Sequence, residues 1–284
     1  MKIGIIGLGL IGGSLGLDLR HLGHEILGVS RQKSTCQRAI EKGVVDQADT
    51  QISSLTSTDI IFICTPIGLI FPTLKQLKPY LKKETIITDV GSVKTPIVLE
   101  CSAFWENFVG GHPMAGTAEQ GIEAAQSNLF KNAPYVITPT ENTPKDGVKI
   151  LEKLAQSLGS IVYHCSPENH DQAVAWISHL PVMVSASLIA SCVRESDPIV
   201  LKLAQQLASS GFKDTSRVGG GNPELGVMMA QYNQRALLRS LITYRQQLDQ
   251  VIEQINTEDW DSLEKLLNET QQGRSPFITP PPQF

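Results

Sequence analysis

The chain has 284 residues and a formal net charge of −4; 41% of its residues are hydrophobic and 18% are charged. This length is sufficient for two domains with cores of their own, and this balance argues against a disordered chain. Because binding to nucleic acid calls for a basic surface, the acidic balance also argues against a nucleic-acid partner.

The amino-terminal segment begins with a lysine and an apolar run, as secretion signals do. Regularly spaced glycines interrupt that run, and Asp18 and Arg20 close it where a cleavage site with small residues would be expected. No stretch reaches the roughly 18 uninterrupted apolar residues of a membrane span. The five cysteines are scattered without pairing or metal-ligand spacing. We therefore expect a cytoplasmic protein with reduced thiols, no bound metal and no membrane association.

Up to about residue 165, short β-rich runs alternate with helical patterns, as in parallel βαβ units. Several runs are apolar throughout, which is typical of strands that are buried on both faces of a sheet. The predicted strands are Lys2–Ile6, Glu25–Val29, Ile60–Cys64, Thr85–Thr88, Asn107–Val109, Tyr135–Thr138 and Ser160–His164, and the predicted crossover helices are Ile11–Leu22, Gly68–Leu81, Thr95–Ser102 and Pro144–Leu158. This pattern predicts an α/β Rossmann-type dinucleotide-binding domain with a parallel sheet over residues 1–165.

After residue 165 the β-rich runs disappear, and apolar residues recur at three- and four-residue spacing. The segments with this pattern are 167–194, 198–210, 223–255 and 258–271. They predict an all-α domain over residues 166–284. Segment 223–255 predicts one helix that is too long to be buried by a single small domain. We therefore expect a homodimer formed through the helical domain.

The pattern GxGxxG, formed by Gly7, Gly9 and Gly12, lies between the first predicted strand and the first predicted helix. In dinucleotide-binding sites these glycines permit a tight turn, the approach of the pyrophosphate and close packing of helix on strand. The amides of Leu10 and Ile11, at the start of the helix, would bind the phosphates. The alternative, glycines that only shape a turn, does not require this spacing between a strand and a helix.

The end of the second predicted strand indicates which cofactor is bound. NAD enzymes normally place Asp or Glu there to bind the ribose 2′-hydroxyl, and this chain has neither. Arg31 can pair instead with a 2′-phosphate through charge-assisted hydrogen bonds, and Ser30, Ser34 or Thr35 can add hydroxyl groups. These residues predict NADP rather than NAD; the alternative is that Arg31 is an ordinary solvated loop residue.

Polar side chains also follow three later strands. Thr65 and Pro66 follow the strand at 60–64, Ser92 follows the next strand, and His112 lies in the segment GGHPMAG. Ligands bind at the carboxyl ends of parallel strands. A histidine between glycines and a proline, just past a strand, is poorly placed for core packing. We therefore expect His112 to face a crevice and to act in catalysis.

Beyond these single features, the motifs GLGLIGGSLGLDLR, TPIG, TDVGSVK, GGHPMAGTAEQG, ISHLP and DTSRVGGGNPELG occur in this order. Together they resemble the prephenate/arogenate dehydrogenase family over residues 3 to about 275, most closely an NADP-dependent arogenate dehydrogenase. The resemblance implies a Rossmann-type domain, a helical dimerisation domain and an oxidoreductase of tyrosine biosynthesis. It also implies that His112 is the central catalytic histidine with Ser92 as its partner, and that His179 and Arg217 bind the substrate.

These residue types suit the reaction that the resemblance implies. Hydride must leave C4 of a cyclohexadiene for the nicotinamide while the C4 hydroxyl loses its proton, and neutral imidazole, with a pKa of about 6.5, can accept that proton. Loss of the C1 carboxylate as carbon dioxide then aromatises the ring. Arg217 would hold a substrate carboxylate with its planar fork. His179 lies in an apolar helical stretch, so only the resemblance makes it a candidate.

One departure from the family pattern bears on the substrate. Prephenate-using relatives often resemble HxPH, whereas His179, Leu180 and Pro181 are followed here by Val182. Arogenate carries an amino group where prephenate has a side-chain keto group. The missing second histidine favours arogenate, which would give tyrosine directly. Oxidation of prephenate to 4-hydroxyphenylpyruvate remains the alternative.

Two other classes of protein stay open at this point. Relatives of the β-hydroxyacid dehydrogenases share the two-domain plan but use a lysine on a helix as acid or base, and no comparable lysine motif is evident. A non-catalytic NADP-binding sensor would keep the glycines. Such a sensor would not need Ser92, His112 and Arg217 together.

Overall fold

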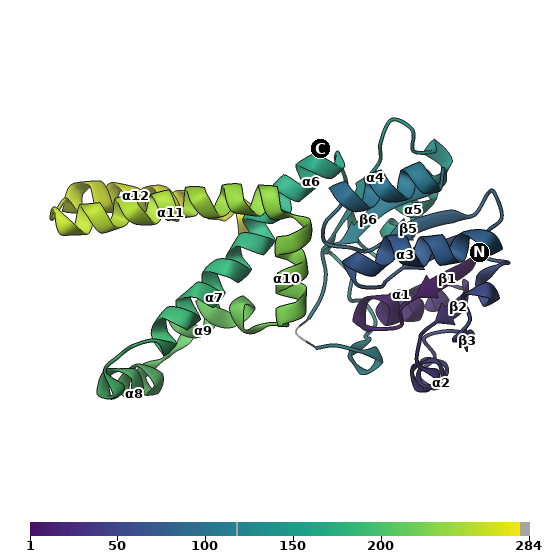
Figure 1. The fold of residues 1–284 in the computed structure, drawn as a ribbon, viewed down its shortest axis with the longest axis horizontal. Coiled ribbons are helices and arrows are strands. Elements are labelled where there is room, and N and C mark those ends of the chain that lie inside the picture. The colour runs from purple at the N-terminus through teal and green to yellow at the C-terminus, as the bar shows by residue number, and fades with distance from the viewer. Residues whose placement is uncertain (118, 279–284) are drawn as a thin grey trace. The chain divides into compact units, whose positions relative to one another are not determined.

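The computed structural model describes residues 1–117 and 119–278, which form two compact units that divide after Ala236. The first unit holds the sheet and the helices up to α10 (Figure 1). The second holds most of α11 (Gln234–Asn256), followed by α12 (Trp260–Gly273) and α13 (Ser275–Ile278). This division does not coincide with the predicted domain boundary at residue 165.

The first unit is built on one eight-stranded sheet with the order β3-β2-β1-β4-β5-β6-β7-β8. Its strands are β1 (Lys2–Ile6), β2 (Glu25–Val29), β3 (Gln47–Asp49), β4 (Ile60–Ile63), β5 (Ile86–Asp89), β6 (Phe108–Pro113), β7 (Pro134–Thr138) and β8 (Ile161–His164). Neighbouring strands are parallel except β6 and β7, which are antiparallel. The predicted Rossmann-type fold with a parallel sheet is confirmed, with the β6–β7 pairing as the one antiparallel exception in this sheet.

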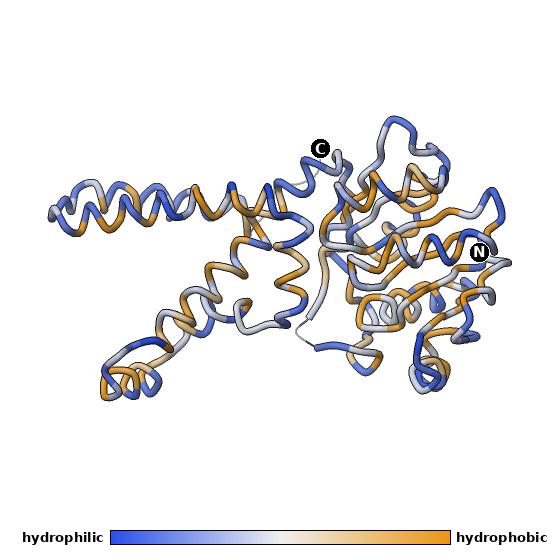
Figure 2. Tube along the Cα trace, in the orientation of Figure 1, coloured by the Kyte–Doolittle hydropathy of each residue, from blue (hydrophilic) through white to orange (hydrophobic). Residues whose placement is uncertain are grey.

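Helices cover both faces of the sheet. They are α1 (Leu10–His21), α2 (Lys33–Glu41), α3 (Ile67–Leu77), α4 (Thr95–Phe104) and α5 (Lys145–Ser157), with short 3-10 turns η1 (Ile52–Leu55), η2 (Lys78–Tyr80) and η3 (Ile122–Ala124). One hydrophobic cluster includes residues of α1 and α5, and a second includes residues of α3 and α4. Strands β1 and β4 contribute side chains to both clusters, so their buried residues are apolar without alternation. Figure 2 shows hydrophobic residues along both the strands and the helices of this unit.

Two elements next to the predicted cofactor residues were not anticipated, α2 and β3. Helix α2 buries only Cys36 and Ala39, and β3 has three residues, none of them buried. Both lie at the edge of the sheet, where little apolar surface is covered. Periodicity of apolar residues therefore could not indicate them.

Strand β6 is longer than predicted, and its second half pairs with β7. His112 therefore lies within a strand, opposite Val136, and not just past one. A Cβ atom on Gly110 would lie 2.5 Å from both Val98 Cγ2 and Thr138 Oγ1, so the glycine permits this close packing. The antiparallel pairing extends the strand and explains why the expected boundary was wrong.

The first unit continues with α6 (Pro167–Val174), the π-helical segment η4 (Ala175–His179) and α7 (Leu180–Val193) as one run. Helices α8 (Pro198–Leu207) and α9 (Ser210–Ser216), the 3-10 turn η5 (Arg217–Gly220) and α10 (Pro223–Tyr232) follow. The prediction of one helix over 223–255 is wrong, because Asn233 separates α10 from α11 with φ −115° and ψ 33°. The side chain of Asn233 donates to the carbonyl of Asp171, which favours this break.

Among the described residues, Pro167–Val193 is one helical run that is long and apolar enough, by length and composition, to cross a membrane. It carries four buried polar side chains: His170, Asp171, His179 and Ser185. All four have hydrogen-bond partners in the first unit, some of them far along the chain. These hydrogen bonds tie the run to other elements of the first unit, although only 28% of its apolar window is buried in the structure.

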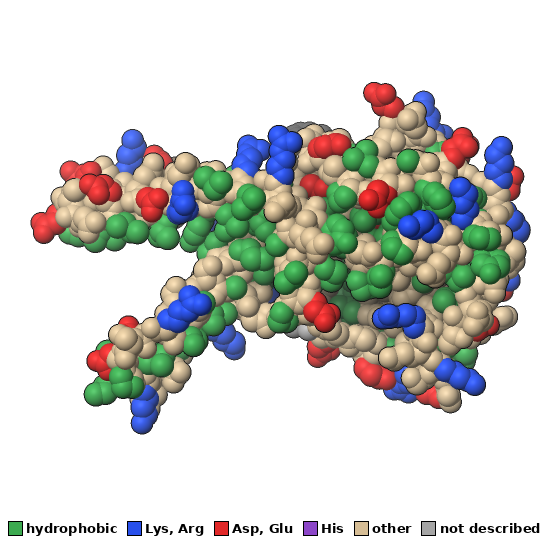
Figure 3. Space-filling model, viewed as in Figure 1, with side chains coloured by type: hydrophobic (Ala, Val, Ile, Leu, Met, Phe, Trp, Pro, Cys, Tyr) green, Lys and Arg blue, Asp and Glu red, His purple; other side chains and the backbone are tan. Residues whose placement is uncertain are grey.

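The second unit presents one apolar side of its helices to solvent. Leu238, Ile242, Leu248 and Ile252 of α11 are each about half exposed, at 46–50%. Figure 3 shows hydrophobic side chains gathered along one side of this helical pair and charged ones along the other. Such a face is typical of a surface that another protein covers.

Candidate active site

The turn between β1 and α1 has the geometry of a dinucleotide cradle. Gly7 adopts φ +98°, and a Cβ atom on Gly12 would lie 2.0 Å from the carbonyl oxygen of Gly7. No atom lies within 4 Å of the position of a Cβ on Gly9, which leaves the backbone open to a ligand there. Gly9 caps α1 without a side chain, so the amides of Leu10 and Ile11 are available to a phosphate. These residues fit a pyrophosphate.

The predicted 2′-phosphate residues gather at the end of β2. The amide of Ser30 donates to the carbonyl of Asp49 at 3.2 Å, and Thr35 Oγ1 donates to Gln32 Oε1 at 3.3 Å in the first turn of α2. Arg31 is exposed and forms neither an ion pair nor a hydrogen bond with any described residue. Its guanidinium is thus available to an anion beside the second strand.

Two hydroxyl groups lack partners at the carboxyl ends of β4 and β5. Thr65 Oγ1 and Ser92 Oγ are buried, and neither forms a hydrogen bond within the described part of the chain. An unpaired buried hydroxyl costs about 1–3 kcal/mol, so a bound ligand that pairs with it is stabilised. Pro66 follows as the N-cap of α3. A Cβ atom on Gly68 would lie 2.5 Å from Tyr232 Oη, so α10 packs against the first turn of α3.

The loop that carries Ser92 is tied to β6 by a buried ion pair. Lys94 Nζ donates to Asp89 Oδ2 and, at 2.8 Å, to the carbonyl of Gly111, the neighbour of His112. Asp89 Oδ1 accepts from the amide of Gly111 at 3.2 Å. Both side chains are fully buried. Burial lowers the pKa of Lys94, and the charge of Asp89 opposes this shift.

His112 is 9% exposed and belongs to a chain of three hydrogen-bonded side chains. Its Nδ1 lies 2.8 Å from His170 Nε2, and His170 Nδ1 lies 2.8 Å from Asp171 Oδ1. Burial, reinforced by His170 and the positive charge of Lys94, lowers the pKa of His112 well below its ordinary value. The imidazole is therefore neutral at neutral pH and can accept a proton.

Asp171 organises this region from α6. Its Oδ1 accepts from the amide of Lys94 at 2.7 Å, and its Oδ2 accepts from the amide of Thr95 at 2.8 Å, at the start of α4. Burial alone would raise the pKa of Asp171, but the hydrogen bonds from His170, Thr95 and Lys94 lower it. One carboxylate thus binds both the chain that ends at His112 and the segment that follows Ser92.

His179, at the end of the π-helical segment, is fully buried. Asn233 Nδ2 donates to the carbonyl of Asp171 at 2.8 Å and to His179 Nδ1 at 3.1 Å. Because Nδ1 accepts, the ring proton of neutral His179 is on Nε2, which has no partner among the described residues. Burial lowers the pKa of His179 to about 4. The side chain presents an unpaired N–H donor, and π-helical segments are frequent at functional sites.

Arg217 is the first residue of η5 and is exposed. Two hydrogen bonds join the segment around Arg217 to Ser185 of α7. Ser185 Oγ donates to the carbonyl of Thr215 at 2.8 Å and accepts from the amide of Gly219 at 2.9 Å. Ser185 lies about 9 Å along the helix from His179 at the usual rise per residue. Arg217 itself makes no hydrogen bond or ion pair with His112, Ser92 or His179.

Five residues of this network were not predicted: Asp89, Lys94, His170, Asp171 and Asn233. In α6 the buried positions are Pro167, His170, Asp171 and Val174. This spacing marks the inward stripe of a helix, and a His-Asp pair on such a stripe requires polar partners. This spacing is the signal in the sequence that indicates His170 and Asp171. Nothing in the sequence indicates Asn233.

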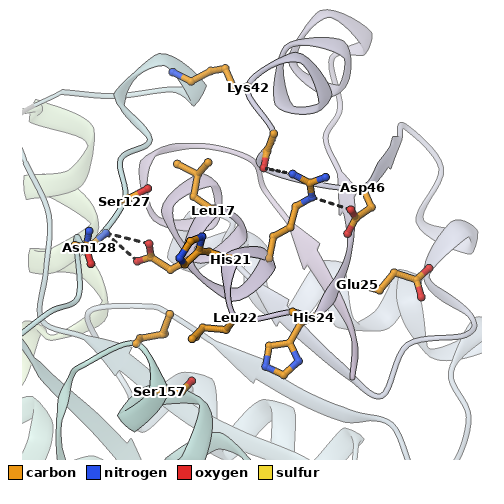
Figure 4. A pocket seen from close by; sticks show the side chains of 15 residues that line it. Leu17, His21, Leu22, His24, Glu25, Lys42, Asp46, Ser127, Asn128 and Ser157 are labelled. Carbon is orange, nitrogen blue, oxygen red and sulfur yellow. Dashed lines mark hydrogen bonds and ion pairs between the residues drawn. The ribbon is translucent and has the colours of Figure 1, made fainter.

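A separate pocket lies at the opposite, amino-terminal edge of the sheet (Figure 4). It is lined by the end of α1, the turn into β2 and parts of three later segments, with Arg20 bound to Asp46 at 2.7 Å. None of the predicted catalytic, substrate or cofactor residues lines it. The predicted residues that follow β1, β4 and β5 lie at the carboxyl ends of these strands, the edge where ligands bind in such sheets.

A dinucleotide cradle after β1 and a buried imidazole on β6 of the same sheet are the features that a nicotinamide-dependent oxidoreductase requires. Residues 15–164 match the family model described as "Prephenate dehydrogenase, nucleotide-binding domain", and residues 166–269 match "Prephenate dehydrogenase, dimerization domain". The chain belongs to the prephenate dehydrogenase family. This membership decides against the β-hydroxyacid dehydrogenase alternative.

Individual relatives agree with the family match. The chain is 32% identical to the prephenate dehydrogenase of Bacillus subtilis over 91% of its own length and 71% of that protein. It is similar to the crystal structure of Synechocystis arogenate dehydrogenase, with 58% identity, a TM-score of 0.88 and coverage of 98% and 100% of the two chains. It also resembles prephenate dehydrogenase from A. aeolicus in complex with hydroxyphenyl propionate and NAD+, with 28% identity, a TM-score of 0.92 and coverage of 98% of each chain.

Proposed function

We propose that this enzyme oxidises and decarboxylates arogenate to tyrosine, with NADP as the cofactor and His112 as the base. The observation that carries the proposal is the neutral, buried imidazole of His112 at the carboxyl edge of the sheet that bears the dinucleotide cradle. The relatives named arogenate dehydrogenase and prephenate dehydrogenase support this reaction class.

The residues divide the reaction between them. Bound nicotinamide supplies the hydride acceptor. His112 takes the proton from the C4 hydroxyl as C4 loses hydride, and the Oγ atom of Ser92 shares the hydrogen bond to that oxygen. Departure of the C1 carboxylate as carbon dioxide leaves its electron pair in the ring, and protonated His112 returns the proton to the phenolate oxygen. His179 Nε2–H and Arg217 bind the substrate carboxylates.

A comparison of turnover with arogenate and with prephenate tests this function. Val182 follows His179 by three residues on one helix face, and its Cγ1 lies 4.0 Å from the position of a Cβ on Gly226 in α10. This position therefore presents a methyl group, not a polar one. We expect kcat/KM with NADP to be at least about tenfold higher for arogenate than for prephenate, because a hydrogen-bonding group missing from a site lowers use of the substrate that needs it.

Growth of NADPH absorbance with each substrate measures this preference. Val182→His is expected to lower the ratio of kcat/KM for arogenate to kcat/KM for prephenate. Val182→Leu serves as the apolar control. A preference for prephenate in the unaltered enzyme would contradict the assignment, and no absorbance change with either substrate would favour the non-catalytic sensor.

Cofactor choice is proposed to depend on Arg31, with Ser30 and Thr35 beside it. Arg31→Ala is expected to raise the dissociation constant for NADP about 10- to 100-fold, which is the loss of one or two hydrogen bonds to a charged group. Binding of NAD, which lacks the 2′-phosphate, should change little. Titration of protein fluorescence with each nucleotide measures both constants.

The control for this variant is Arg38→Ala. Arg38 also belongs to the α2 region, but its guanidinium is paired with Glu123 at 2.6 Å. Its removal should leave the ratio of the NADP and NAD constants unchanged. An equally unchanged ratio in Arg31→Ala would show that Arg31 does not select the cofactor.

We also propose a cytoplasmic homodimer, with residues 1–165 as the dinucleotide-binding domain and residues 166–284 as the substrate and dimerisation domain. The match of residues 166–269 to a dimerization-domain model supports this. So do the exposed apolar residues of α8, which buries none of its own; Ile199 and Leu207 are 77% and 70% exposed. We expect the ligand bound at this site to be a small-molecule substrate.

A further inference from the structure

The hydrogen bonds of Asp171 determine the direction of the chain that ends at His112. The carboxylate of Asp171 already accepts from the amides of Lys94 and Thr95. A carboxylate can only accept, so His170 Nδ1 must donate to it. When His170 holds this one ring proton, its Nε2 carries a lone pair and accepts from His112 Nδ1–H across 2.8 Å. The lone pair of His112 is consequently on Nε2.

We propose that His170 and Asp171 are positioning residues that hold His112 in the tautomer with an unprotonated Nε2 and stabilise the imidazolium formed during the reaction. The inference rests on the proposed role of His112 as the base. The proton that arrives on Nε2 forms an imidazolium, whose Nδ1–H remains bonded to His170. The same proton later leaves from Nε2 to the product oxygen, so no net proton enters the chain.

The surroundings make this arrangement necessary. His112 is 9% exposed, His170 is 2% exposed and Asp171 is 5% exposed, so water cannot replace a missing partner. The positive charge of Lys94, from the β5–α4 segment, acts against a positive charge on His112. Asp89 is paired with Lys94, which leaves Asp171, through His170, as the anion that supports the imidazolium.

Asp171 also couples the two proposed catalytic side chains. It binds the amides at positions 94 and 95, directly after the loop of Ser92, and it binds His170 through the same Oδ1 atom that accepts from Lys94. A shift of α6 would therefore move His112 and the Ser92 loop together.

The tautomer can be tested without substrate. In the full-length enzyme labelled with 15N-histidine, NMR at neutral pH is expected to show His112 protonated at Nδ1 and bare at Nε2, and His170 protonated at Nδ1. His112→Asn and His170→Leu assign the resonances. A His112 ring protonated at Nε2, with His170 protonated on both nitrogens, would overturn the proposal.

Kinetics test the consequence for catalysis. His170→Leu removes the acceptor, and kcat is expected to fall about 100-fold, as expected when a base loses its correct tautomer. KM and the NADP dissociation constant should stay within about threefold, because His170 is not assigned to ligand binding. His170→Gln keeps an acceptor near the Nε2 position, so its kcat is expected to be about tenfold higher than that of His170→Leu.

His164→Leu is the matched control, since this exposed histidine lies on β8 and should leave kcat unchanged. If His170→Leu does not fold, the difference between His170→Gln and the unaltered enzyme, together with the NMR tautomer, decides the proposal. Unchanged kcat in His170→Leu or His170→Gln overturns it. Full activity of His112→Asn would instead refute the base assignment, which is a separate result from the tautomer observed by NMR.

Discussion

Replacing His112 with Asn is expected to lower kcat for arogenate about 1000-fold, within the usual contribution of a positioned general base. The amide of Asn can still donate to His170 from the position of Nδ1, so the buried chain of hydrogen bonds and the fold are retained. The cradle of α1 is on another segment, and the dissociation constant for NADP should therefore be unchanged. Stopped-flow or steady-state NADPH absorbance and a nucleotide titration measure the two quantities.

The pH profile gives an independent reading of the same residue. The neutral imidazole is the active form, and burial lowers the pKa of His112 well below 6.5. Activity should persist as the pH falls through 6.5 and decline only near the lower pKa of the folded enzyme. If kcat/KM falls on acidification with a midpoint at or above pH 6.5, this would contradict the conclusion that burial lowers the pKa of His112. His24→Asn, which changes a histidine in the pocket at the other edge, is the control and should leave the profile unaltered.

Replacing Lys94 with Met is expected to destabilise the protein by about 3–5 kcal/mol, because it leaves a buried carboxylate without its cation. Asp89 would keep only the amides of Gly91 and Gly111 as partners. The carbonyl of Gly111 would lose the donor from Lys94 as well, which loosens the strand next to His112. Urea denaturation followed by tryptophan fluorescence and circular dichroism measures the shift in midpoint.

Two variants control this prediction. Lys149→Met alters an exposed lysine of α5 that is 69% accessible, and it should change stability by less than about 0.5 kcal/mol. Asp89→Asn combined with Lys94→Met removes both charges and should be more stable than Lys94→Met alone. A Lys94→Met protein as stable as the Lys149→Met protein would show that the pair does not hold this loop.

The sheet and the cradle were predictable because their signals are local. Strands β1 and β4 are buried on both faces, so each one is an apolar run that stands out from the helices that flank it. The glycine pattern is read within six residues, and each of its glycines has a role that depends on immediate neighbours. The edge elements α2 and β3 bury too little apolar surface to be detected in this way.

Among the site residues, the sequence identified His112, Ser92, His179 and Arg217 as candidates, but not what surrounds them. The histidine within α6 lies 58 residues from His112, and no local rule connects the two. The apolar spacing on both sides of Asn233 predicts a continuous helix across it. Its side chain instead bonds Asp171 and His179, and the helix ends there.

The amino-acid sequence by itself determined the Rossmann-type sheet, the dinucleotide cradle, the helical segment after residue 165 and the family to which the enzyme belongs, because periodicity and short motifs express local geometry. Only the tertiary structure decided that β7 runs against β6, that His112 lies inside a strand, and that His170 and Asp171 stand behind it. Those features depend on hydrogen bonds between segments that are distant in the chain. A buried polar group requires a hydrogen-bond partner, and here that partner comes close only when the chain has folded.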